Sequence, residues 1–110
     1  KSGLLLADVS NSISSEPLTV EIAGLTDKFT SLKVDAVLSN TDGNTYQASF
    51  ILPVGYVAEG NTYVHSCRGY ATKTVFFDSC IYCTLSGAAL SFKQLVPGGG
   101  YVSSVKIFSL

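Results

Sequence analysis

Alternation of apolar and polar residues is the sequence feature that most constrains the fold of this chain. In the stretch LTVEI (residues 18–22) every second side chain is apolar, and the stretches SLKVDAVL (31–38) and TYQASFIL (45–52) repeat this pattern. A strand that buries one face needs a period of two, whereas an amphipathic helix needs a period near 3.6. No segment shows a sustained helical period. The sequence therefore predicts an all-β protein.

Turn-forming residues divide the chain into short strands. The Asp42-Gly43 pair, between the second and third of these stretches, is typical of the tight turn of a β-hairpin. After the third stretch, Pro53 and Gly55 predict a loop that leads to the next strand. Further strands are predicted at residues 4–8, 62–66, 70–77, 80–85, 88–95 and 101–108, with turns at Asp78-Ser79, Ser86-Gly87 and 97–100. About eight or nine short strands predict a compact antiparallel β-barrel or a jelly-roll-like sandwich.

The last predicted strand, YVSSVKIF, departs from simple alternation. Tyr101, Val105 and Ile107 fall on one side of it, while Val102 and Phe108 fall on the other. A strand that is apolar on both sides is covered twice, either within its own chain or by another chain. The sequence leaves both explanations open.

The length and the ends of the chain predict a single domain. A chain of 110 residues is large enough for one hydrophobic core and too short for two. It has no apolar run of about 18 residues, so no membrane insertion is predicted. It also lacks an initiator Met and the pattern of a secretory signal. We therefore interpret residues 1–110 as one domain, the C-terminal fragment of a longer protein.

Charge argues against one class of partner, and hydroxyl groups favour another. Seven Lys or Arg against eight Asp or Glu give a net charge of -1, with no basic block. No nucleic-acid partner is predicted, because binding to a phosphate backbone needs clustered cations. Charged residues make up 14% of the chain, and 15 Ser and 9 Thr supply the polarity instead. Such a surface suits saccharide recognition, and it also suits a face covered by a neighbouring subunit.

The three cysteines, Cys67, Cys80 and Cys83, are an odd set and so cannot form a closed disulfide framework. We interpret them as small buried thiols in a reducing compartment. Together with His65 they also offer four potential zinc ligands. Positions 80 and 83 are three apart on a predicted strand, however, and therefore point to opposite faces. No metal and no cofactor are predicted, and a zinc-stabilised structural β-domain stays an alternative.

The sequence offers little that favours catalysis. His65 is the only histidine, and no Gly-x-Ser-x-Gly sequence accompanies it for nucleophilic catalysis. Most of the eight carboxylates fall on predicted exposed strand faces or in turns. We expect them to be solvated charges there rather than a pair of carboxylates for general acid-base catalysis. The sequence therefore predicts that the protein is not an enzyme.

One segment concentrates the residue types of a saccharide site. The stretch NTYVHSCRGY (61–70) combines aromatic rings, which pack on sugar rings, with side chains that hydrogen-bond to hydroxyls. Its arginine also offers a forked contact to a phosphate. The alternative is that its tyrosines belong to the core and its arginine is a solvated surface charge. The predicted saccharide-binding residues are Asn61, Tyr63, His65, Arg68, Tyr70, Asp78 and Tyr82.

The second half of the chain resembles a known family. Four stretches resemble, in this order, the C-terminal head domains of bacteriophage receptor-binding proteins from tail tips and baseplates: LPVGYVAEGNTYV, GYATKTVFF, CIYCTLSG and GGGYVSSVKIFSL. In such heads a strand often ends in a Pro-x-Gly-Tyr element, to which Pro53, Gly55 and Tyr56 are similar. The resemblance covers roughly residues 50–110.

This resemblance implies a compact antiparallel barrel or jelly roll that assembles as a homotrimer and binds saccharides of a bacterial cell envelope. It implies a location in the virion, at the phage tail tip or baseplate, for a protein made in the bacterial cytoplasm. Two alternatives of other classes stay open, a trimeric jelly-roll domain of the C1q or tumour-necrosis-factor kind that binds protein, and the zinc-stabilised structural domain. An immunoglobulin-like module fits less well, because the chain lacks the buried Trp and the paired cysteines of such domains.

Overall fold

A computed structural model describes residues 3–10, 17–39, 43, 45–70, 76–95 and 101–110, and for residues 69, 70, 76, 77 and 95 it describes the backbone alone. This part of the chain contains eight strands and two short helices. In chain order they are β1 (Leu5–Ser10), β2 (Leu18–Glu21), α1 (Leu25–Lys28), β3 (Ser31–Ser39), β4 (Thr45–Pro53), α2 (Val54–Ala58), β5 (Tyr63–Tyr70), β6 (Phe76–Ser86), β7 (Ala89–Leu95) and β8 (Tyr101–Ser109).

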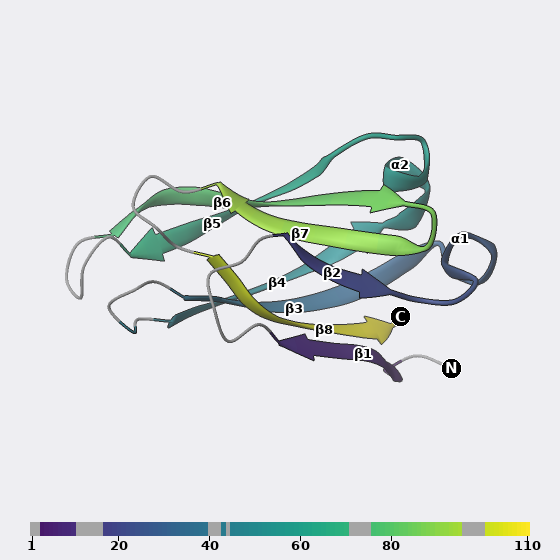
Figure 1. Ribbon diagram of the computed structural model, residues 1–110, viewed down its shortest axis with the longest axis horizontal. Helices are drawn as coiled ribbons and strands as arrows, with labels where there is room; N and C mark the ends of the chain where they lie inside the picture. The colour runs from purple at the N-terminus through teal and green to yellow at the C-terminus, as the bar shows by residue number, and fades with distance from the viewer. Residues whose placement is uncertain (1–2, 11–16, 40–42, 44, 71–75, 96–100) are drawn as a thin grey trace.

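The strands form two four-stranded antiparallel sheets that face each other (Figure 1). Sheet A has the order β1-β8-β3-β4, and sheet B has the order β2-β7-β6-β5. Strands β1 and β2 lie together at one edge of the sandwich, and β4 and β5 lie together at the other. The predicted all-β sandwich is thereby confirmed, although its two sheets do not close into a barrel.

The core lies between the sheets, where the predicted alternation places it. The predicted inward side chains of β3 are all buried, from Leu32 to Leu38. They meet side chains from the inner face of sheet B, of which Phe92 is the largest that is fully buried. Each such apolar side chain contributes about 1.5–3 kcal/mol on burial. Both helices lie at one end of the sandwich (Figure 1), and Val54 and Val57 of α2 are buried there.

A predicted hairpin and a predicted turn are confirmed. Strands β3 and β4 pair in an unbroken register from Ser31 opposite Pro53 to Ser39 opposite Thr45. Gly43 in their connection has a φ of 83°, a left-handed conformation that favours glycine. Strands β6 and β7 meet at a turn that contains Gly87. Asp42 and the predicted turn at residues 97–100 lie outside the described residues.

The predicted turn at Asp78-Ser79 is wrong, because β6 runs through both residues and is paired with β5 along this length. Asp78 is exposed on the outer face, and the Ser79 hydroxyl accepts a hydrogen bond from the Gln94 amide, with 3.1 Å between Nε2 and Oγ. Pairing with β5, together with the hydrogen bond from Gln94 of β7, outweighs the local preference of Asp and Ser for turns.

The predicted loop after Pro53 contains a single helical turn, α2. The sequence gives no helical period here, because the helix is only five residues long. The helix follows β4 without a connecting loop. Pro53 still pairs with Ser31, and the Val54 N–H donates to the Thr30 carbonyl at 3.0 Å.

A β-bulge explains part of the two-sided apolar pattern of the last strand. Strand β8 carries a bulge between Ser104, which lies opposite Val37, and Val102, which lies opposite Leu38. The extra residue, Ser103, shifts the alternation by one, so that Val102 joins Val105 and Ile107 in the core. Tyr101 and Phe108 are left as the large side chains on the other face, where both are half-buried.

Candidate functional site

Strand β5 divides the predicted saccharide-binding residues between two faces of sheet B. Its alternation turns Tyr63, His65 and Cys67 toward the interior and leaves Val64 and Arg68 exposed on the outer face. The structure therefore does not bring Tyr63 and His65 together with Arg68. Tyr70 ends β5, and its side chain is outside the described part of the structure.

The inward residues of β5 pack against sheet A. The Phe50 ring of β4 stacks on the Tyr63 ring with 5.7 Å between centroids, and on the His65 ring with 4.7 Å. Partial burial lowers the pKa of His65, so the neutral ring is favoured. These contacts assign Tyr63 and His65 to packing at the edge of the core. The alternative interpretation of the segment expected this for Tyr63 but not for His65.

The cysteines are free thiols in three surroundings. Cys83 lies in the core, and burial raises its pKa to about 12. Cys67 is half-buried on the same face, and its pKa is raised by burial and by the charge of Cys80, while a hydrogen bond with Ser79 opposes the shift. Cys80 lies on the outer face, so it is not the core thiol that we expected. No group of three His, Cys, Asp or Glu side chains that could hold a metal ion occurs among the described residues.

Arg68, Asp78 and Tyr82 share the outer face of sheet B. Arg68 and Asp78 are direct partners on β5 and β6, and both are exposed. Tyr82 lies four residues farther along β6, a distance of about 13 Å on a strand. The pKa of Tyr82 is raised, and the largest cause is a hydrogen bond with Cys80. Burial and the charge of Cys80 raise it further.

A groove crosses the outer face of sheet B beside Tyr82. We call it the hydroxyl groove; it has a volume of about 370 Å³ and is lined by Pro17, Thr62, Tyr82, Thr84, Ser91 and Lys93. The strand register explains this gathering, because Thr84 lies opposite Ser91 and Tyr82 lies opposite Lys93. Four of the six lining side chains carry a hydroxyl group, and Lys93 is the one charged residue among them.

A second hollow adjoins the hydroxyl groove at Thr62. This tyrosine hollow has a volume of about 330 Å³ and is lined by Pro53, Tyr56, Thr62, Tyr63 and Val64. Tyr56 projects from α2 and meets the Tyr63 ring edge to face, with 6.4 Å between ring centroids. Asn61 supports the same corner, since its side-chain amide donates to the Tyr56 carbonyl at 3.1 Å. Of the predicted residues, Tyr63 and Tyr82 therefore line the two hollows, and Asn61 braces one of them.

Sequence reasoning missed most of the hydroxyl groove. Each of Thr84, Ser91 and Lys93 stands at an outward position of an alternating stretch, and that signal was present in the sequence. Their proximity depends on which strands are neighbours, and the alternation within a strand carries no such information.

Comparison with known proteins identifies no relative of this chain. No protein-family model matches it, and neither a curated protein nor a solved structure does. Within the described residues, neither helix has the length and apolar character needed to cross a membrane.

Proposed function

We propose that this domain is a non-catalytic receptor-binding module that recognises saccharides on a bacterial cell envelope. In this proposal it is the head domain of a phage tail receptor-binding protein, made in the bacterial cytoplasm and carried at the tail tip or baseplate of the virion. One observation carries the proposal: the hydroxyl groove on the outer face of sheet B and the tyrosine hollow share Thr62 as a lining residue.

The tyrosine hollow suits the apolar face of a sugar ring. Tyr56 is 46% exposed and stands edge-on to Tyr63, so the two rings and Pro53 form an angled apolar corner. Sugar rings have apolar C–H faces, which pack against aromatic rings without a charge on either partner. The rigidity of this corner lowers the entropy lost on binding, because Tyr63 is already held by Phe50.

The hydroxyl groove suits the polar rim of the next sugar units. Thr62, Thr84 and Ser91 each offer a hydroxyl that both donates and accepts hydrogen bonds, as sugar hydroxyls do. Lys93 adds a positive charge for which the described residues provide no ion pair. The ligand is therefore proposed to be a saccharide with an anionic group near Lys93. Arg68 and Asp78 lie farther along the same face, where they would contact a longer oligosaccharide.

Affinity at one such site is expected to be weak, in the millimolar to micromolar range, or about -4 to -8 kcal/mol. The proposed assembly is a homotrimer, which presents three sites to one cell surface. Linked sites raise the overall avidity by orders of magnitude without any new contact. Host attachment through many weak sites then requires no catalysis by the domain.

The direct test is calorimetric titration of the domain with three probes, a hexose, the same hexose carrying a 1-phosphate, and the corresponding hexuronic acid. We expect the phosphate and carboxylate forms to bind more tightly than the neutral sugar. Lys93→Gln should lower affinity for the anionic probes about tenfold, because a charge-assisted hydrogen bond contributes about 1.5–3 kcal/mol. Tyr82→Leu should weaken binding of all three probes.

A matched control is Lys106→Gln, which removes an exposed mid-strand lysine from the other sheet. It should leave all three titrations unchanged. Absence of binding to all three probes would contradict the proposed function. Equal losses in the Lys93 and Lys106 variants would contradict the assignment of the anion site to the hydroxyl groove.

A further inference from the structure

The outer face of sheet A carries a row of apolar side chains across its strands. Ile51 of β4 lies opposite Lys33 of β3, Lys33 lies opposite Phe108 of β8, and Phe108 lies opposite Leu5 of β1. Leu5 is 53% exposed and Ile51 is 47% exposed, while Phe108 is half-buried beneath Lys33, whose Nζ is 5.9 Å from the ring centroid. We call Leu5, Phe108 and Ile51 the apolar row, in which Lys33 lies between Phe108 and Ile51.

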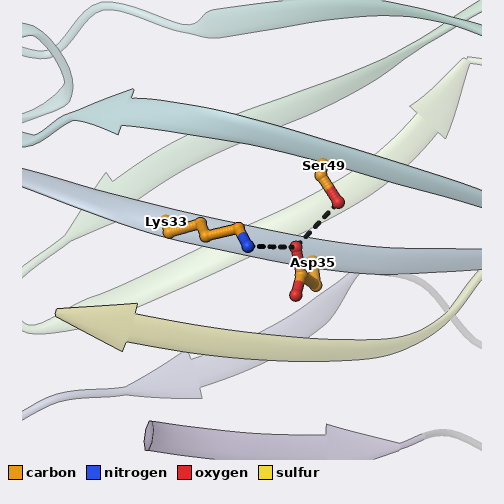
Figure 2. A network of polar contacts seen from close by, with 3 residues as sticks. All are labelled: Lys33, Asp35 and Ser49. Atoms are coloured by element: carbon orange, nitrogen blue, oxygen red, sulfur yellow. Dashed lines mark hydrogen bonds and ion pairs between the residues drawn. The ribbon is translucent and has the colours of Figure 1, made fainter. Parts of the chain in front are cut away.

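Charges of alternating sign fill the adjacent row of the same face. In register across the sheet, Asp8 lies opposite Lys106, Lys106 opposite Asp35, and Asp35 opposite Ser49. Figure 2 shows the Asp35 end of this charged row, where the Ser49 hydroxyl donates to Asp35 Oδ1 at 2.7 Å and Lys33 Nζ lies 3.9 Å from the same oxygen. The two aspartates and the two lysines of the face balance one another.

We propose that the outer face of sheet A is the surface through which copies of this chain associate. Single exposed apolar residues are ordinary, but Leu5 and Phe108 are direct neighbours on β1 and β8, and Ile51 follows in the same register on β4, beyond Lys33. Association would remove these side chains from water. The charged row fits a second copy in particular. Because the face carries equal numbers of opposite charges in alternation, a copy displaying the same face can place lysines against aspartates without net repulsion.

This inference rests on the self-association in the proposed function and gives it a location. It also agrees with the position of the saccharide site. Sheets A and B form opposite sides of the sandwich (Figure 1). The strand residues that line the hydroxyl groove belong to the outer face of sheet B, so contact through sheet A leaves the groove open.

The experiment measures molar mass by light scattering coupled to size-exclusion chromatography, at low micromolar chain concentration with reducing agent. The wild-type protein should run as a multiple of the 11.6 kDa chain. Ile51→Asp and Leu5→Asp, at opposite ends of the apolar row, should each reduce the mass to one chain. The matched control is Val64→Asp, a change of similar exposure on sheet B that should leave the mass of the assembly unchanged. Circular dichroism and a thermal melt check that each variant is folded.

A wild-type mass of one chain overturns the inference, and so does an Ile51→Asp variant that assembles as the wild type does. Titration of the wild type and of Ile51→Asp with the hexose 1-phosphate tests the assembly surface and the proposed function separately. Saccharide binding by a monomeric wild type refutes only the assembly surface. An assembly that Ile51→Asp dissociates but that binds no saccharide supports the surface and refutes the receptor function. A mass of two chains supports the surface and contradicts the trimer.

Discussion

At the scale of single residues, the thiol of Cys83 links burial to the pH dependence of stability. Its side chain has no exposed surface in the core of sheet B, and burial raises its pKa to about 12. In the unfolded chain a thiol titrates near pH 8.5–9. Below about pH 9 both states hold the proton, and the full stability is present. As the pH rises from about 9 toward 12, the unfolded chain loses a proton that the folded chain keeps, so stability falls by about 1.4 kcal/mol per pH unit.

Replacing Cys83 by alanine should remove this contribution. We expect urea-unfolding free energies of the wild type to fall more steeply than those of Cys83→Ala between pH 8.5 and 10.5, by a slope that approaches about 1.4 kcal/mol per pH unit at the upper end. The comparison cancels the titration of tyrosines and lysines that both proteins share. The variant will start from a lower stability because it has a small cavity, but the difference in slope does not depend on that offset. If the free energies of unfolding of the two proteins fell in parallel with rising pH, Cys83 would not be titrating as a buried thiol.

At the scale of elements, the bulge in β8 decides which side chains reach the core. Ser103 is the additional residue, and its hydroxyl accepts a hydrogen bond from the Ser39 hydroxyl at 2.8 Å and donates to the Val37 carbonyl at 3.0 Å. On β3, Val37 and Leu38 are consecutive, but their partners on β8 are Ser104 and Val102. Ser103 therefore has no opposite residue on β3, and the pairs on either side of it are those of a regular antiparallel ladder. Deletion of Ser103 should therefore keep every other side chain of β8 on its present face.

This placement predicts opposite outcomes for two single-residue deletions in the same strand. Deleting Ser103 should lower the free energy of unfolding by only about 1–3 kcal/mol, the value of its two hydrogen bonds. Deleting Lys106 should be far worse, because it reverses the alternation between Val105 and Ile107 and turns a buried side chain outward. Urea unfolding followed by circular dichroism measures both. Similar losses for the two deletions would contradict the role assigned to the bulge.

Elements that follow from the local sequence pattern were predictable, whereas features that depend on pairing with another strand were not. The alternation in residues 31–38 and 45–52 predicted β3, β4 and their inward side chains correctly. The bulge at Ser103 and the extension of β6 through Asp78 depend on pairing with other strands. The sequence of one strand, considered alone, does not reveal that pairing. The candidate site followed the same division. Tyr82 was recognised by residue type, whereas Lys93 joins it only through the β6–β7 register.

At the scale of the whole molecule, the order of strands in sheet A makes the end of the chain a central part of the fold. The last strand, β8, lies between β1 and β3, while β1 is at the sheet edge. Val102, Val105 and Ile107 of β8 are fully buried. Near the chain ends, the Gly3 N–H donates to the Ser109 carbonyl at 2.8 Å, so β1 is held by the strand that is last in sequence. Sheet A is therefore incomplete until the whole chain is present.

Truncation from the two ends should accordingly have unequal effects. Removal of residues 101–110 deletes three buried side chains worth about 5–9 kcal/mol together, which is comparable with the entire stability of a small domain. It also leaves β3 and β1 without a neighbour between them, and we expect the product to be unfolded. Removal of residues 1–10 takes away an edge strand whose Ala7 and Val9 are only partly buried, so a folded domain with a lower melting temperature is expected. Far-UV circular dichroism and the dispersion of amide resonances distinguish the two states. A folded product after removal of residues 101–110 would contradict the central position of β8, because the remaining strands would then have formed a sheet without it.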